Sequence, residues 1–79
     1  MNKTGAFKAL LDGQNVTLAC RYWEREERHL FEAEYFGKKE RKAYFDHSIQ
    51  CIKNDFRDIS TFYGGNKADC TFTWSINNE

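Results

Sequence analysis

The clearest pattern of apolar positions in the chain is a helical stripe between residues 46 and 65. Its members recur at steps of three and four, as on the buried face of an amphipathic helix: Ile49, Ile52, Phe56, Ile59 and Tyr63. Asp46 can cap the first turn by accepting a bond from a backbone N–H, and Gly64 and Gly65 can adopt the left-handed conformation that ends helices. We therefore predict a helix over residues 46–65, with Phe56 as its central core residue.

Alternation of apolar and polar positions predicts strands on both sides of this helix. The segments 6–11 (AFKALL) and 16–23 alternate and are separated by the turn-forming residues 12–15, which indicates a hairpin. In the second of these strands, four residues are expected to face the helix: Val16, Leu18, Cys20 and Tyr22. The most regular alternation covers residues 70–76, where one face carries Cys70, Phe72, Trp74 and Ile76.

The middle of the chain fits two secondary structures. Residues 24–28 form a charged cluster that suits a solvated loop. Residues 29–36 (HLFEAEYF) can alternate as a strand, but the same residues are good helix formers and Gly37 could end a helix. We favour the strand because its aromatic pairs fit a sheet, and we keep the helix as the alternative. A tight turn at residues 37–38 and a further strand over residues 40–45 then lead into the long helix.

Together these elements predict an α+β fold, with a single antiparallel β-sheet (order β-β-β-β-α-β) packed on one amphipathic helix. The chain of 79 residues contains no proline, internal repeat or linker-like tract, so residues 1–79 are expected to form one small domain. A domain of this size buries about 60% of the surface that its unfolded chain exposes, so its stability depends on few core residues.

Charge and composition narrow the classes of function. Twelve basic and twelve acidic residues give a formal net charge of zero, whereas a domain that grips nucleic acid usually carries a basic excess. No signal peptide and no apolar run of the length needed to cross a bilayer is recognisable, so we expect a soluble, cytoplasmic protein. The 13 aromatic residues (seven Phe, four Tyr and two Trp) exceed what so small a core can enclose, and this surplus favours a binding surface.

The residues that could carry chemistry do not form a catalytic set. His47 and Cys51 are four positions apart on the predicted helix, which is a spacing for two zinc ligands or for a Cys–His nucleophile. However, the sequence has no C-x-x-C knuckle, no glycine-rich phosphate loop and no pair of carboxylates in a catalytic arrangement. We therefore expect no enzyme activity, no cofactor and no metal, with three free thiols at Cys20, Cys51 and Cys70.

The predicted sheet places a candidate partner-binding surface on its open face. Trp23 and Arg21 point away from the helix if the alternation is as stated, and charged and aromatic residues of the next two strands are expected to join them. A tryptophan surrounded by Arg, Tyr and charges has the composition of an interface hot spot. The predicted set is Arg21, Trp23, Glu32, Glu34, Lys42 and Tyr44.

These features predict a small non-catalytic protein-binding module, a stoichiometric inhibitor or adaptor that acts on a larger protein or ribonucleoprotein. In size and character it is similar to phage- or mobile-element-encoded inhibitors such as anti-CRISPR proteins, although no sequence motif carries that likeness. The alternative is a weak nucleic-acid-binding domain that uses the dense basic run on the predicted hairpin: Lys38, Lys39, Arg41 and Lys42. Assembly into a homodimer is compatible with either function.

Overall fold

The structure, a computed structural model, describes residues 1–62 and 70–77. The elements follow one another along the chain in the order α1 (Lys3–Leu11), β1 (Asn15–Tyr22), β2 (Arg25–Phe31), α2 (Ala33–Phe36), the 3₁₀ turn η1 (Lys39–Arg41), α3 (Lys42–Phe62) and β3 (Thr71–Asn77). No helix in this part of the chain is both long and apolar enough to cross a membrane.

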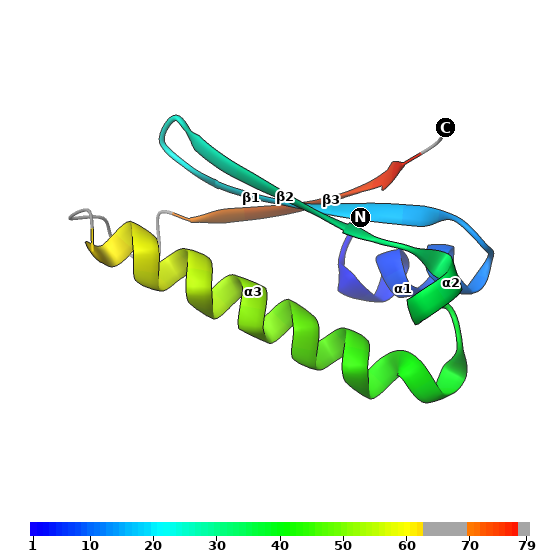
Figure 1. Cartoon of the computed structure of the whole chain (residues 1–79). Coiled ribbons are helices and arrows are strands. Elements are labelled where there is room, and N and C mark those ends of the chain that lie inside the picture. Colours follow the sequence, from blue (N-terminus) through cyan, green and yellow to red (C-terminus); the bar gives the residue numbers. More distant parts are fainter. Residues whose placement is uncertain (63–69, 78–79) are drawn as a thin grey trace.

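The three strands form one antiparallel sheet in the order β2-β1-β3. In Figure 1, the described helices all lie on one side of this sheet, and no described helix or strand covers its other, bare face. The predicted α+β class, the single antiparallel sheet and the long helix are therefore confirmed, but the sheet has three strands rather than the five of the predicted order. Two predicted strands are absent, namely those over residues 6–11 and 40–45.

Residues 6–11 are helical because local capping and helical burial override the short alternation. The side chain of Asn2 accepts a hydrogen bond from the Gly5 N–H at 2.9 Å and so caps α1. Alanine, leucine and lysine all favour helices, and a six-residue window is too short to separate the two periods. The buried residues of α1 follow the helical spacing: Ala6, Phe7, Ala9 and Leu10.

The long helix begins earlier than the sequence suggests. Residues 40–45 form η1 and the first turn of α3, so Asp46 lies inside the helix and is not its N-cap. The physical reason is that Phe45 extends the apolar stripe by one step of four ahead of Ile49, and both side chains are buried. Phe56 is also buried as predicted, while Tyr63, Gly64 and Gly65 lie outside the described residues.

The segment between β1 and α3 combines both structures considered for it. The predicted loop over residues 24–28 is wrong, because β2 already begins at Arg25 and pairs along β1. The strand predicted over residues 29–36 ends at Phe31, and the helical alternative holds for α2. Asn15 Oδ1 accepts the Ala33 N–H at 2.9 Å and fixes the start of α2. Gly37 ends α2 against α1, where any side chain would collide with backbone carbonyl oxygens.

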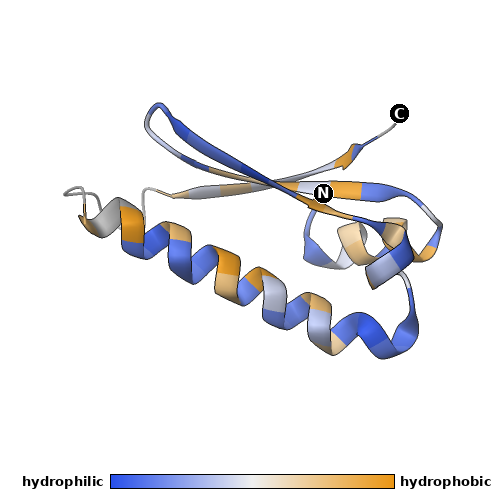
Figure 2. Cartoon of the chain, in the orientation of Figure 1, coloured by the Kyte–Doolittle hydropathy of each residue, from blue (hydrophilic) through white to orange (hydrophobic). Residues whose placement is uncertain are grey.

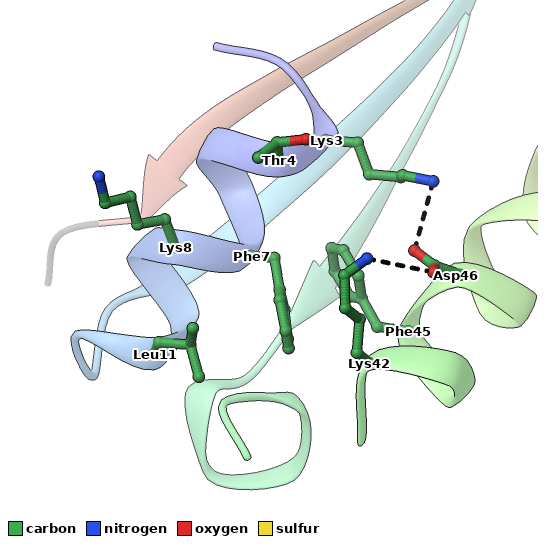
Figure 3. Close-up of a pocket in the computed structure, with 8 residues that line it drawn as sticks. All are labelled: Lys3, Thr4, Phe7, Lys8, Leu11, Lys42, Phe45 and Asp46. Atoms are coloured by element: carbon green, nitrogen blue, oxygen red, sulfur yellow. Dashed lines mark hydrogen bonds and ion pairs between the residues drawn. The ribbon is translucent and has the colours of Figure 1, made fainter. Parts of the chain in front are cut away.

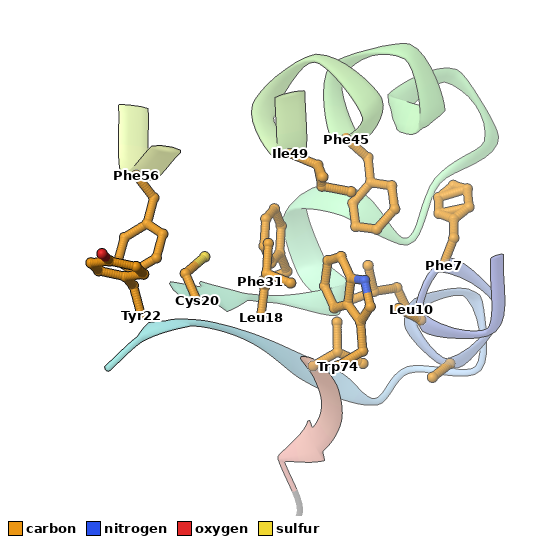
Figure 4. Close-up of a cluster of buried hydrophobic side chains, with 13 residues drawn as sticks. Phe7, Leu10, Leu18, Cys20, Tyr22, Phe31, Phe45, Ile49, Phe56 and Trp74 are labelled. Atoms are coloured by element: carbon orange, nitrogen blue, oxygen red, sulfur yellow. The ribbon is translucent and has the colours of Figure 1, made fainter. Parts of the chain in front are cut away.

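The core lies between the helices and the covered face of the sheet, and Phe45 is its aromatic centre (Figure 4). The ring of Phe45 is fully buried and lies within 6.0 Å, centroid to centroid, of four other rings. These rings come from α1, β2, α2 and β3, and are Phe7, Phe31, Phe36 and Trp74. Phe56 lies at the other end of the cluster and meets the ring of Phe72 edge-on at 6.2 Å.

We predict that Phe45→Ala lowers the free energy of unfolding by about 3–5 kcal/mol, because it leaves a cavity where four elements meet. Phe56→Ala removes a ring at the end of the cluster and should destabilise the protein less. Urea unfolding followed by circular dichroism measures both values, with the exposed Gln50→Ala as a control within about 0.5 kcal/mol of the unmutated protein. A larger loss for Phe56→Ala than for Phe45→Ala would contradict the central place of Phe45.

Candidate functional site

The tip of the β1–β2 hairpin is an unusual site for a large side chain. Tyr22 pairs with Arg25, so Trp23 and Glu24 form the two-residue turn. Trp23 is 77% exposed and has a φ of 53°. Within residues 1–62 and 70–77, it is the one non-glycine residue with a positive φ. Bulky side chains rarely adopt this conformation, which favours glycine or asparagine.

Contacts with the hairpin hold the Trp23 ring in place. Its centroid lies 5.1 Å from that of Tyr22, and the two rings are nearly parallel at 12°. Tyr22 is itself buried, so the exposed indole stacks on a side chain that is fixed in the core. The guanidinium Nε of Arg21 donates a long hydrogen bond of 3.5 Å to the Trp23 carbonyl oxygen. These two contacts define how the exposed ring is oriented on the hairpin.

Alternating charges surround this tip. Arg28 Nε lies 3.3 Å from Glu26 Oε1, and Arg25 lies 3.8 Å from Glu27 along the same strand. Such pairs are screened by water and contribute little to stability. They give β2 a mixed-charge surface next to Trp23, and Figure 2 shows this strand as strongly hydrophilic.

The structure does not bring the six predicted partner-binding residues onto one face. Arg21 and Trp23 lie at the closed end of the β1–β2 hairpin. The other four residues follow its open end, where Val16 pairs with Phe31. The expected common face depended on a strand over residues 40–45, and that segment is helical. The second group lies on or beside α2 and in the first turn of α3: Glu32, Glu34, Lys42 and Tyr44.

A groove of about 250 Å³ lies between α1 and the first turns of α3 (Figure 3). Phe7 and Phe45 line it, and their rings stack with centroids 5.1 Å apart. Lys3 and Lys42 reach the two oxygens of Asp46 at 3.3 and 3.4 Å. Partial burial of Asp46 acts in the opposite direction, but the hydrogen bonds from these two ammonium groups hold its pKa below the usual value.

The basic run lies at the same end of the molecule, although it is not on a hairpin. Its residues occupy η1 and its two flanking positions, and all are exposed: Lys38, Lys39, Arg41 and Lys42. Lys3 and Lys8 of α1 line the same groove as Lys42, which the sequence analysis missed because it placed α1 in the sheet. Phe36 and Tyr44 stack beside the run, with centroids 5.6 Å apart. If residues 6–11 had been predicted as a helix, Lys3 and Lys8 would have been expected near the basic run.

His47 and Cys51 share a helix face as predicted. Cys51 Sγ lies 3.5 Å from His47 Nε2, and both side chains are exposed on α3. Because α3 begins at Lys42, Cys51 lies well inside the helix and not near its start, where the sequence prediction had placed it. No group of three or more possible metal ligands occurs in the described part of the chain.

Searches against protein family models, curated proteins and solved structures found no match to this chain. The candidate site is therefore judged on its own geometry.

The cysteines give a test of the core. Burial, reinforced by the Glu27 carboxylate opposite it on β2, raises the pKa of the Cys20 thiol from 9.0 to about 11. A thiol that resists ionisation in the folded state stabilises the fold fully below pH 9, and this contribution is lost as the pH rises towards 11. We predict that the free energy of unfolding declines with pH across this range.

Comparison of variants isolates the part due to Cys20. Cys20→Ala should be less stable at pH 8 because of its cavity, but it should lose less stability between pH 9 and 11 than the unmutated protein. The control Cys51→Ala, at an exposed thiol, should keep the full decline. Urea unfolding at each pH gives the values, and equal slopes for the two variants would contradict the assignment.

Proposed function

We propose that this chain is a non-catalytic protein-binding module, a stoichiometric inhibitor or adaptor that docks on a larger protein or ribonucleoprotein through the tip of the β1–β2 hairpin. The observation that supports this proposal is the conformation of Trp23. Its backbone has a positive φ and its indole is 77% exposed.

Folding alone does not favour tryptophan at this position. A left-handed conformation costs a non-glycine residue about 1–2 kcal/mol. The ring is largely exposed, so burial offsets little of this cost. Glycine or asparagine would make the same turn without the strain. A strained and exposed aromatic residue is better explained by a role in binding than by a role in stability.

The surroundings of Trp23 suit a protein partner. Trp and Arg are among the residues enriched at interface hot spots, and the tip exposes both as Trp23 and Arg21. Covering about 150 Å² of the ring at about 25 cal/mol per Å² contributes about 4 kcal/mol before the entropy of association is subtracted. Because the indole already stacks on Tyr22, little additional ordering is required when it binds.

The alternative, a nucleic-acid-binding domain, is supported by the enlarged basic end. Lys3 and Lys8 lie around the same groove as Lys42, and the stacked Phe36–Tyr44 pair could extend a base stack. Two observations weigh against it. Asp46 already pairs with two of these lysines, and the chain as a whole has no net charge. We therefore favour the protein partner.

We predict that Trp23→Gly keeps the fold and loses the partner. Glycine relieves the positive φ, so the melting temperature should stay within a few degrees of the unmutated value or rise. The immobilised protein is incubated with nuclease-treated host lysate and washed in high salt, and it should retain a partner. The Trp23→Gly variant should retain at least about tenfold less of that partner. Tyr44→Ala, at the other end of the molecule, is the matched control and should retain the partner fully.

Two results would overturn the proposal. One is equal capture of the same protein by Trp23→Gly and the unmutated chain. The other is capture that disappears with nuclease or high salt and with charge reversal at Lys38, Lys39 and Arg41, but survives Trp23→Gly. The second result would establish the nucleic-acid alternative.

A further inference from the structure

The two outer strands of the sheet differ in how their edges are protected. The order β2-β1-β3 leaves one edge of β2 and one edge of β3 without a strand partner among the described residues. Natural proteins usually protect such edges with charges, prolines or bulges, since an exposed ladder invites another strand to pair. β2 (REERHLF) carries four successive charged residues, whereas β3 (TFTWSIN) carries no charge and no proline. Figure 2 shows the contrast, with the charged part of β2 blue and most of β3 pale.

The sequence of β3 is complementary to itself when it is reversed about its central residue, Trp74. An antiparallel copy in this register places Phe72 opposite Ile76, which pairs two apolar side chains on the covered face. On the bare face it places Thr73 opposite Ser75, where hydroxyl groups can hydrogen-bond across the strands. The two terminal residues of the strand, both polar, also meet: Thr71 and Asn77.

We propose that a second copy of this chain pairs with the β3 edge, so that two molecules form one continuous six-stranded antiparallel sheet. The pairing is isologous, because each β3 strand presents the same seven residues to the other about a twofold axis that passes midway between the two Trp74 residues. To pair with a strand of another protein, β3 would only need to alternate between apolar and polar residues. The match of apolar with apolar and hydroxyl with hydroxyl about one central residue is expected only if β3 pairs with a copy of itself.

The exposure of apolar side chains along the β3 edge agrees with a second copy as the partner. Ile76 projects from the same side of β3 as the buried Trp74, yet it is 37% exposed, and no described strand lies beyond β3 at this edge. Phe72 is partly buried, and its ring has Lys53 Nζ and the Arg57 guanidinium carbon 5.1 and 4.9 Å from its centroid. In the dimer, Ile76 of one copy covers the remaining edge of Phe72 in the other.

The charges of the sheet also make the assembly stop at two molecules. Pairing through β3 uses the neutral edge of each copy and leaves both β2 edges outermost. Those edges carry alternating basic and acidic clusters, which resist further strand addition. The contact is short, a single strand of seven residues, so we expect a weak dimer with a Kd on the order of 10 µM to 100 µM.

The test places like charges across the twofold axis. Thr73 and Ser75 are exposed on the bare face, so Thr73→Lys/Ser75→Lys can be accommodated in the monomer. In the dimer, the two introduced lysines of one copy face those of the other, and the Kd should rise at least about tenfold. The opposite variant, Thr73→Glu/Ser75→Glu, should also be monomeric alone. An equimolar mixture of the two variants should dimerise again, because opposite charges then face each other.

Sedimentation equilibrium from about 5 µM to about 500 µM measures the mass of each sample, and circular dichroism verifies that the variants are folded. The control is Glu26→Lys on β2, which changes a charge on the other edge and should leave the dimer unchanged. A monomeric mass for the unmutated protein across the whole range would overturn the proposal. So would a lysine variant that dimerises as well as the unmutated protein, or a mixture that stays monomeric.

Discussion

The packing of the Phe45 ring is the contact on which the rest of the structure depends. This ring joins both short helices to α3 and to the two outer strands, through four aromatic neighbours that come from different elements. In a domain with so little interior, such a contact fixes the distance between the helical layer and the sheet. The hairpin tip at Trp23 lies beyond this core, at the closed end of β1 and β2. Its two turn residues, Trp23 and Glu24, are exposed, so packing in the core does not dictate their identity.

The elements that were predicted correctly from the sequence are those with a regular pattern of buried and exposed side chains along their whole length. Strands β1 and β3 alternate between a buried and a bare face, and the stripe through Ile49 and Phe56 is regular, so these parts were predicted correctly. The errors concern short segments. Residues 6–11 alternate over only a few positions, and their helix depends on the Asn2 cap and on packing against the sheet. Phe45 was assigned to a strand because periodicity over residues 40–45 does not distinguish a strand end from a first helical turn.

The candidate site was predictable in part for the same reason. Trp23 was placed outside the core by counting along β1, and the structure has it exposed. Its positive φ could not be read from the sequence, because tryptophan rarely adopts this conformation. Lys42 and Tyr44 were expected beside Trp23 through a strand that does not form, so one predicted surface became two separate regions. The position of these residues in the fold was harder to predict than which residues are exposed.

The two proposals reinforce each other through geometry. In the proposed dimer, a twofold axis that passes between the two Trp74 residues and is perpendicular to the sheet keeps the helices of both copies on the same side. Because β1 runs antiparallel to β3, it also places the two Trp23 tips at opposite corners of the six-stranded sheet. One tip of a weak dimer can then bind a first site while the other is held near a second site on the same assembly, at an effective concentration far above that of the free chain. A repeating or twofold-symmetric partner would gain from this arrangement, and a monomeric partner with one site would not. Under the two proposals, the number of hairpin tips that one partner engages therefore links the oligomeric state of this chain to the kind of target.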